Sequence, residues 1–219
     1  MVQRRSSWLF RGLSPLLLPV YLMLIPLPAA ADAAPKLVIF GDSLTAGFGV
    51  APKDAFPAQL EAALRARGHS VEVINAGVSG DTAENALDRF DWAIPEDASA
   101  VIVELGANDA LRGIDPVKTR ATLDTILTRL NSRKLPVLLA GMVAPRNWGD
   151  SYKSDFELMY ANLAKSHGVT LYPFFLEGVA LDTALNQPDG LHPNARGVAV
   201  IVARMLTAAE ELLAKIAKK

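Results

Sequence analysis

The stretch Leu37-Val-Ile-Phe-Gly-Asp-Ser-Leu-Thr-Ala-Gly47 joins four apolar residues to a polar turn. A short continuous apolar run of this kind is typical of a strand that is covered on both faces. Similar runs recur along the chain, and the five strand candidates are 37–40, 71–74, 100–105, 136–140 and 170–174. The pattern therefore favours a parallel sheet built from buried strands.

Amphipathic stretches separate these strand candidates. We expect helices over 55–67, 82–91 and 154–167, a further helix that begins at Asp115, and a last one from about Asn194 to Ala217. For the second helix we expect a capping box in which Asp81 precedes the helix and Glu84 lies three positions later. Because strands and helices alternate at the spacing of a βα unit, the sequence predicts an α/β fold with helices on both faces of the sheet.

The composition excludes several classes of protein. The 219 residues include no Cys, which rules out thiolate-bound metals, thiol catalysis and disulfide scaffolds. With 22 basic and 23 acidic residues, the chain lacks the positive excess that holds a phosphate backbone, so we expect no nucleic acid partner. Its length suits one domain.

The amino terminus is predicted to be a signal peptide that export removes. Three arginines precede an apolar run, and small residues follow over 28–34. Prolines interrupt the run, which is shorter than the ~20 apolar residues of a membrane span, so an uncleaved anchor is the weaker alternative. We expect a signal peptide over 1–33, a single domain over 34–219, a periplasmic or secreted location, and no stable membrane anchor after processing.

Polar clusters follow the strand candidates where the strands end. They lie over 41–47, 75–82 and 106–109, and a fourth lies over 188–194 after the last strand. The carboxyl ends of parallel strands meet at one edge of a sheet, so we expect these clusters to converge. They contain a serine, backbone donors, a side-chain amide and an Asp-His pair, which are the parts of an acyl-transfer site.

Ser43 is the candidate nucleophile because it follows a strand and opens a turn or short helix. The alternative is a serine that caps a structural or anion-binding turn. His192 is the candidate base, since His69 and His167 occupy positions next to helix ends and are expected to be structural. Asp189 would orient the imidazole of His192. The alternative is an ordinary turn aspartate beside a histidine that caps the last helix.

The candidate donors to a tetrahedral oxyanion are the backbone N–H groups of Ser43 and Gly80 and the side-chain amide of Asn108. Taken singly, Gly80 and Asn108 are ordinary turn residues. We expect no metal and no cofactor, because Asp189 and His192 have no evident third ligand nearby and no glycine motif for phosphate or dinucleotide binding occurs.

Apolar residues in two loops are predicted to bind the substrate. Phe48 follows the serine turn, whereas Met142 and Trp148 follow the fourth strand candidate. An apolar pocket gains roughly 0.8 kcal/mol for each methylene that it buries, so these residues favour an acyl chain. The alternative is that Met142 completes the strand in the core and leaves Trp148 at the surface.

Four blocks together resemble those of the GDSL or SGNH hydrolase family. They are Gly41-Asp-Ser-Leu44, Ser79-Gly-Asp-Thr82, Gly106-Ala-Asn-Asp109 and Asp189-Gly-Leu-His192. The resemblance extends over 36–217 and is greatest to the bacterial thioesterase, lysophospholipase and arylesterase branch. It implies Ser43 as nucleophile, His192 as base and Asp189 as orienting acid. It also implies Ser43, Gly80 and Asn108 as oxyanion donors, on a five-stranded flavodoxin-like sheet without a metal.

The sequence therefore predicts an exported serine esterase that hydrolyses carboxylic esters and acyl thioesters through an acyl-enzyme. The expected partner is a small-molecule acyl ester or thioester. One alternative is a carbohydrate O-deacetylase on the same fold. An alternative from another class is a non-catalytic, flavodoxin-like protein that binds an anion at the Ser43 turn.

Overall fold

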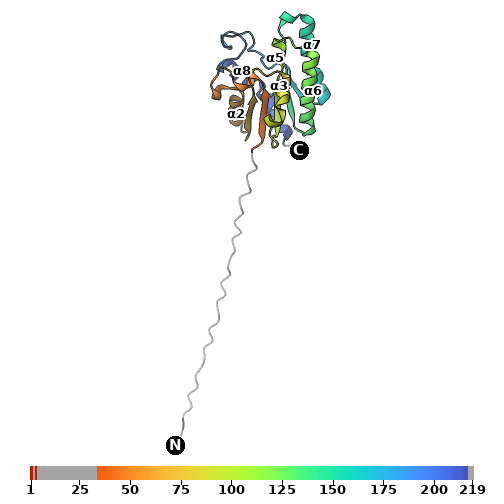
Figure 1. The fold of residues 1–219 in the computed structure, drawn as a ribbon. Coiled ribbons are helices and arrows are strands. Elements are labelled where there is room, and N and C mark those ends of the chain that lie inside the picture. Colours follow the sequence, from red (N-terminus) through yellow and green to blue (C-terminus); the bar gives the residue numbers. More distant parts are fainter. Residues whose placement is uncertain (2, 4–33, 217–219) are drawn as a thin grey trace. The chain divides into compact units, whose positions relative to one another are not determined.

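The computed structural model describes residues 1, 3 and 34–216 (Figure 1). The predicted signal peptide therefore lies, apart from residues 1 and 3, outside the described residues. Residues from Ala34 onward form a compact unit of their own, which contains every helix and strand discussed below. Within the described part of the chain, no helix combines the length and the apolar character needed to cross a membrane.

A five-stranded parallel sheet lies at the centre of this unit. In sheet order its strands are β2 (Glu72–Gly77), β1 (Lys36–Gly41), β3 (Ala100–Glu104), β4 (Val137–Ala140) and β5 (Thr170–Tyr172). Each neighbouring pair is parallel. This strand order is that of flavodoxin-like folds, so the predicted sheet is confirmed.

The central strands are buried, whereas the two edge strands are only partly covered. All residues of β3 and β4 are buried, but β2 and β5 contain no buried residue. The expectation that every strand is covered on both faces is therefore wrong for β2 and β5, which lie at the rim of the sheet. β2 also extends to Gly77, beyond its predicted end, because its last residues continue the ladder with β1.

Helices cover both faces of the sheet and complete the predicted three-layer α/β/α arrangement (Figure 1). On one side α2 (Phe56–Ala66) packs against α8 (Ala195–Ile216). On the other side α6 (Pro116–Ser132) packs against both α3 (Ala83–Asp88) and α7 (Asp150–His167). The short elements are α1 (Ser43–Ala46), α4 (Phe90–Ala93), α5 (Ala107–Leu111) and the 3₁₀ turns η1 (Pro52–Asp54) and η2 (Arg146–Trp148).

Two helices begin at other residues than predicted. The capping box of α3 is formed by Thr82 and Asn85, not by Asp81 and Glu84. Asn85 N donates to Thr82 Oγ1 at 3.3 Å, and Thr82 N donates to Asn85 Oδ1 at 3.3 Å. The helix α7 begins at Asp150, before its predicted start, because its first turn is polar and adds nothing to the apolar pattern.

The register of the sheet brings the polar segments to one level. Gly41, the last residue of β1, pairs with Gly77 of β2 and with Glu104 of β3. A Cβ atom at Gly77 would lie 2.5 Å from the backbone nitrogen of Ala46, so only glycine lets α1 pack this closely against the end of β2. The residues that follow the three strands therefore start side by side.

Candidate active site

Three side chains from distant segments form a chain of hydrogen bonds. Ser43 Oγ lies 2.9 Å from His192 Nε2, and His192 Nδ1 lies 2.7 Å from Asp189 Oδ2. Because an ionised carboxylate can only accept, the imidazole proton belongs on Nδ1, and Nε2 then accepts from the Ser43 hydroxyl. The structure thus brings together the three residues that the sequence singled out.

Ser43 is held at the beginning of α1. The preceding residue, Asp42, caps this helix, and its Oδ1 accepts from Leu44 N at 3.0 Å. The helix ends at Ala46 and is capped by Gly47, whose φ of 88° lies in the left-handed region that favours glycine. A buried strand before Ser43 and a tight turn after it therefore fix the position of the hydroxyl.

Asp189 and His192 lie in a closed loop before α8. Asp189 Oδ1 accepts from Leu191 N at 2.9 Å and from His192 N at 3.0 Å. These two backbone amides, together with the imidazole of His192, lower the pKa of Asp189 to about 2. The carboxylate therefore stays ionised throughout the neutral range.

The other two histidines face carboxylates away from this loop. His69 Nε2 lies 3.2 Å from Glu210 Oε1, and His167 Nε2 lies 2.8 Å from Asp124 Oδ1. Within residues 34–216, neither ring has a serine or threonine hydroxyl as a hydrogen-bond partner. Their positions agree with the structural roles expected of them.

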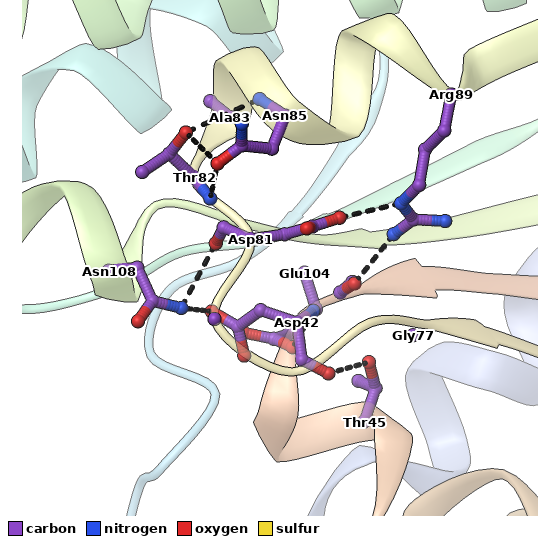
Figure 2. A network of polar contacts seen from close by, with 12 residues as sticks. Asp42, Thr45, Gly77, Asp81, Thr82, Ala83, Asn85, Arg89, Glu104 and Asn108 are labelled. Atoms are coloured by element: carbon purple, nitrogen blue, oxygen red, sulfur yellow. Dashed lines mark hydrogen bonds and ion pairs between the residues drawn. The ribbon is translucent and has the colours of Figure 1, made fainter.

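The three candidate oxyanion donors differ in whether they already donate hydrogen bonds to other residues. Among the described residues, no acceptor pairs with the backbone N–H of Ser43 or with that of Gly80. By contrast, Asn108 Nδ2 donates to Asp42 Oδ2 at 3.1 Å and to Asp81 O at 3.0 Å (Figure 2). Both amide hydrogens of Asn108 are thus already engaged, an arrangement that the sequence did not indicate.

A buried acidic pair beneath Ser43 escaped the sequence analysis. Asp42 and Glu104 are fully buried, and Asp42 N donates a long hydrogen bond of 3.4 Å to Glu104 Oε2. Glu104 Oε1 has no hydrogen-bond partner within the part of the chain that the structure describes. The only signal in the sequence is that Glu104 lies between apolar residues and that Asp42 follows an apolar strand run by two positions.

Burial controls the protonation of this pair. It raises the pKa of Asp42 to about 6, although hydrogen bonds from Leu44 N and Asn108 act against the shift. It raises the pKa of Glu104 well above the ordinary range, and the nearby Asp42 carboxyl adds to that rise. Burial and the closeness of the two carboxyl groups therefore favour the protonated form of both acids.

Arg89 is the second group that the sequence left without a role. Its Nε donates to Asp81 Oδ2 at 2.6 Å and its Nη2 donates to Gly41 O at 2.9 Å. Figure 2 shows the guanidinium of Arg89, the residue between α3 and α4, reaching toward both the loop after β2 and the end of β1. Arg89 thus ties together the segments that precede Ser43 and follow Gly80. A single arginine in a helical pattern carries no sign of such burial.

The three predicted acyl-binding residues lie in different surroundings. Phe48 is 50% exposed, and its ring centroid lies 4.5 Å from that of His192. Trp148 is 46% exposed, and its Nε1 donates to a backbone carbonyl of α5. Met142 is only 3% exposed, whereas the adjacent Val143 is 40% exposed. The placement of Met142 matches the alternative in which it completes the core.

Two hollows on the surface lie at α6 and α7, and no residue of the candidate site lines either of them. In the described residues, no three His, Asp or Glu side chains gather as a metal site would require. The feature that supports a chemical role is the hydrogen-bonded set of Ser43, His192 and Asp189.

Comparisons with known proteins extend the likeness over most of the chain. Residues 39–200 match the sequence profile of the GDSL-like Lipase/Acylhydrolase family. The chain is 39% identical over 175 residues to thioesterase 1/protease 1/lysophospholipase L1 of Escherichia coli (strain K12), covering 80% of this chain and 83% of that protein. It is 37% identical over 168 residues to an arylesterase of Vibrio mimicus, covering 76% of this chain and 84% of that protein.

A solved structure supports the same likeness. AlinE4, an esterase of the SGNH-hydrolase family, superposes with a TM-score of 0.70 at 43% identity, covering 84% of this chain and 99% of that one. The four short blocks of sequence thus belong to a similarity that includes the whole sheet.

Proposed function

The chain belongs to the GDSL-like lipase/acylhydrolase family and is an ester-hydrolysing serine hydrolase, and from that premise we propose that it cleaves carboxylic esters and acyl thioesters through an acyl-enzyme on Ser43. One observation carries the proposal: the 2.9 Å separation of Ser43 Oγ and His192 Nε2, with Asp189 on the far side of the imidazole. A turn that only binds an anion would not require a histidine and an aspartate aligned with its serine.

The first half-reaction transfers the acyl group to the protein. Ser43 Oγ attacks the carbonyl carbon of the ester while the hydroxyl proton moves to His192 Nε2. Asp189 stabilises the imidazolium without taking its proton. When the bond to the leaving group breaks, His192 gives the proton to the departing alkoxide or thiolate, and the acyl group remains on Ser43.

The second half-reaction releases the acid. A water molecule attacks the acyl carbon, passes a proton to His192 Nε2 and forms a second tetrahedral intermediate. Collapse of this intermediate breaks the bond to Ser43 Oγ, which takes the proton back. The free carboxylic acid then leaves, and the serine and histidine regain their starting states.

The oxyanion of both intermediates needs hydrogen-bond donors. The N–H groups of Ser43 and Gly80 are unpartnered among the described residues and are the first two donors. Asn108 supplies a third by sharing one of the hydrogens that it gives to Asp42 and Asp81. Each donor aimed at the oxyanion contributes about 3 kcal/mol to lowering the barrier.

A fluorophosphonate probe tests the nucleophile. The probe should label the wild-type protein at Ser43, as peptide mass mapping would show, and Ser43→Ala should be folded, unlabelled and slower in ester hydrolysis by several orders of magnitude. A folded wild-type protein that is not labelled, or a Ser43→Ala variant within about tenfold of wild-type activity, would favour the anion-binding alternative.

Exposed apolar side chains in two loops support the proposed class of substrate. Phe48, Val143 and Trp148 offer apolar surface in the loops after β1 and β4, whereas a sugar cleft would require several polar groups. We therefore expect kcat/KM to rise from acetyl to butyryl or hexanoyl p-nitrophenyl esters. A steady fall from acetyl upward, together with rapid deacetylation of acetylated xylan, would instead identify a carbohydrate O-deacetylase.

Export is proposed from the sequence pattern of residues 1–33. The mature protein should begin at Asp32 or Ala34 and be recovered from a periplasmic or extracellular fraction. Amino-terminal sequencing of the fractionated protein checks this, and an intact Met1 in the cytosol contradicts it.

A further inference from the structure

The proposed chemistry depends on how two loops from opposite ends of the chain meet. Ser43 lies in the turn after β1, whereas His192 lies 149 positions later in the loop before α8. Neither loop is a continuation of the other, since one follows β1 and the other precedes α8. Contacts between the two loops must therefore hold the imidazole of His192 within hydrogen-bonding distance of Ser43 during turnover.

The loop that carries His192 is closed by its own hydrogen bonds. It is closed by an antiparallel bridge between Asn186 and Pro193 and by a hydrogen bond of 2.8 Å from Gln187 N to His192 O. Asn186 anchors the base of the loop, since its Nδ2 donates to Val179 O at 2.7 Å. These contacts fix His192 relative to Asp189, but they do not place either residue relative to Ser43.

The side chain of Gln187 makes that connection. Its Nε2 donates to Phe48 O at 2.7 Å, in the serine turn, and to Pro193 O at 3.0 Å, in the histidine loop. Apart from the Ser43 to His192 contact itself, this is the one hydrogen bond between 43–50 and 185–194 in the described structure. Both amide hydrogens of Gln187 are used, so the side chain sets the spacing of the two carbonyls.

The surroundings of Gln187 are built for close approach. Gly49 has a φ of 72°, and a Cβ atom there would lie 2.0 Å from Gln187 Oε1. The ring of Phe48, whose carbonyl accepts from Gln187, lies against the imidazole of His192 with centroids 4.5 Å apart. The same contact that joins the loops thus also keeps an aromatic ring on the face of the candidate base.

We infer that Gln187 is a positioning residue, which clamps the Phe48 turn to the His192 loop and so holds the imidazole in line with Ser43. The inference rests on the proposed function. Gln187 touches neither reacting atom, and it acts through the placement of His192. Its loss should therefore reduce the rate of the chemical steps and leave substrate affinity nearly unchanged.

Two variants remove the clamp in different ways. Gln187→Leu keeps much of the volume and removes both donors, whereas Gln187→Glu keeps the shape and, when ionised, turns the donor into an acceptor that faces two carbonyl oxygens. Gln59→Leu is the matched control. Gln59 is a half-buried glutamine whose Nε2 donates to Asp54 O and Ala195 O. It makes no hydrogen bond to Phe48 or Pro193.

The test is steady-state hydrolysis of a p-nitrophenyl ester at about pH 8, where the carboxyl group introduced by Gln187→Glu is ionised. We expect both Gln187 variants to lose roughly 10- to 100-fold in kcat, as a small misplacement of a reacting group does, with KM within about twofold. The rate constant for fluorophosphonate labelling of Ser43 should fall in parallel. Gln59→Leu should lower the Tm by about as much as the Gln187 variants do, and it should keep kcat within about threefold of wild type.

Three results would overturn the inference: a kcat of the Gln187 variants within about threefold of wild type, a loss confined to KM, or an equal kcat loss in Gln59→Leu. If Gln187→Leu does not fold, Gln187→Glu decides alone. Failure of the proposed function would look different, because the wild-type protein would then not be labelled at Ser43. A labelled wild type with unaffected Gln187 variants leaves that function standing and removes the clamp.

Discussion

Asp189 shows how much of the candidate site is decided by single side chains. The residue is partly exposed, yet two backbone amides and an imidazole lower its pKa to about 2. A carboxylate in this state is a permanent acceptor for the Nδ1 proton of His192, which leaves Nε2 free to accept from Ser43. The orientation of the base therefore does not change with pH in the neutral range.

Asp189→Asn tests this orientation. The amide can present a donor to Nδ1 and select the wrong tautomer, so we expect kcat to fall by roughly 1,000- to 10,000-fold. Because the wild-type pKa is about 2, protonation of Asp189 should cause no loss of activity between about pH 5 and 9. Activity of the variant within about tenfold of wild type across that range would contradict the assigned role.

Glu104 acts at the same scale but on stability. Its folded-state pKa is raised by burial and by Asp42, so the folded protein keeps a proton that the unfolded chain releases above about pH 4.3. Release of the proton stabilises the unfolded state. The free energy of unfolding therefore decreases as pH rises above this value. The slope approaches about 1.4 kcal/mol per pH unit for one proton. The raised pKa of Asp42 acts in the same direction.

Glu104→Gln should remove this dependence, because the amide has no proton to lose. We expect the variant to gain stability relative to wild type as pH rises from about 5 to 8, with little gain at the acid end. Urea unfolding at several pH values gives the two free energies. A difference between variant and wild type that does not change with pH would show that Glu104 is ionised in the folded protein.

At the scale of elements, the short helix α1 depends on its contacts. A helix of only four residues, Ser43–Ala46, has no stability of its own, so packing sets its position. Gly77 provides that packing surface at the end of β2, where a Cβ atom would lie within 3 Å of Thr45 Oγ1 and of the Ala46 backbone. The place of Ser43 thus depends also on a glycine on a neighbouring strand.

Gly77→Ala should displace α1 and lower both stability and activity. Overpacking of this kind costs about 1–3 kcal/mol in folding free energy, and we expect kcat to fall at least about tenfold. Gly68→Ala is the control, since Gly68 has a φ of 88° and no atom within 4 Å of its Cβ position. It should cost about 1 kcal/mol of stability through backbone strain and leave kcat unchanged. Equal effects of both variants on kcat would refute this account.

At the scale of the whole molecule, residues 34–216 contain the complete sheet, both helix layers and every residue of the candidate site. A chain that begins at Ala34 should therefore fold with the Tm of the full-length chain.

Its kcat/KM for a p-nitrophenyl ester should also equal that of the full-length chain. Thermal unfolding and ester hydrolysis measured side by side on the two chains check this prediction. A truncated chain that unfolds at a clearly lower temperature, or hydrolyses the ester several-fold more slowly, would show that residues 1–33 belong to the working protein.

The flavodoxin-like sheet was implied by the resemblance to the GDSL or SGNH family, whereas the sequence itself determined the order of strands and helices and singled out Ser43, Asp189 and His192. These features depend on local properties: the period of apolar residues, the turn-forming residues at strand ends, and short blocks that keep their order along the chain. Each can be recognised within a window of a few residues, so no knowledge of distant contacts was needed.

Only the tertiary structure decided which polar groups are buried together. Asp42 and Glu104 are 62 positions apart, and they meet because Gly41 pairs with Glu104 in the parallel register of β1 and β3. The same register places Asn108 between Asp42 and Asp81, and it draws Asp81 toward Arg89 instead of the α3 cap. The burial of a charged group depends on the segments that cover it, and those segments are remote in sequence, so no local pattern carries this information.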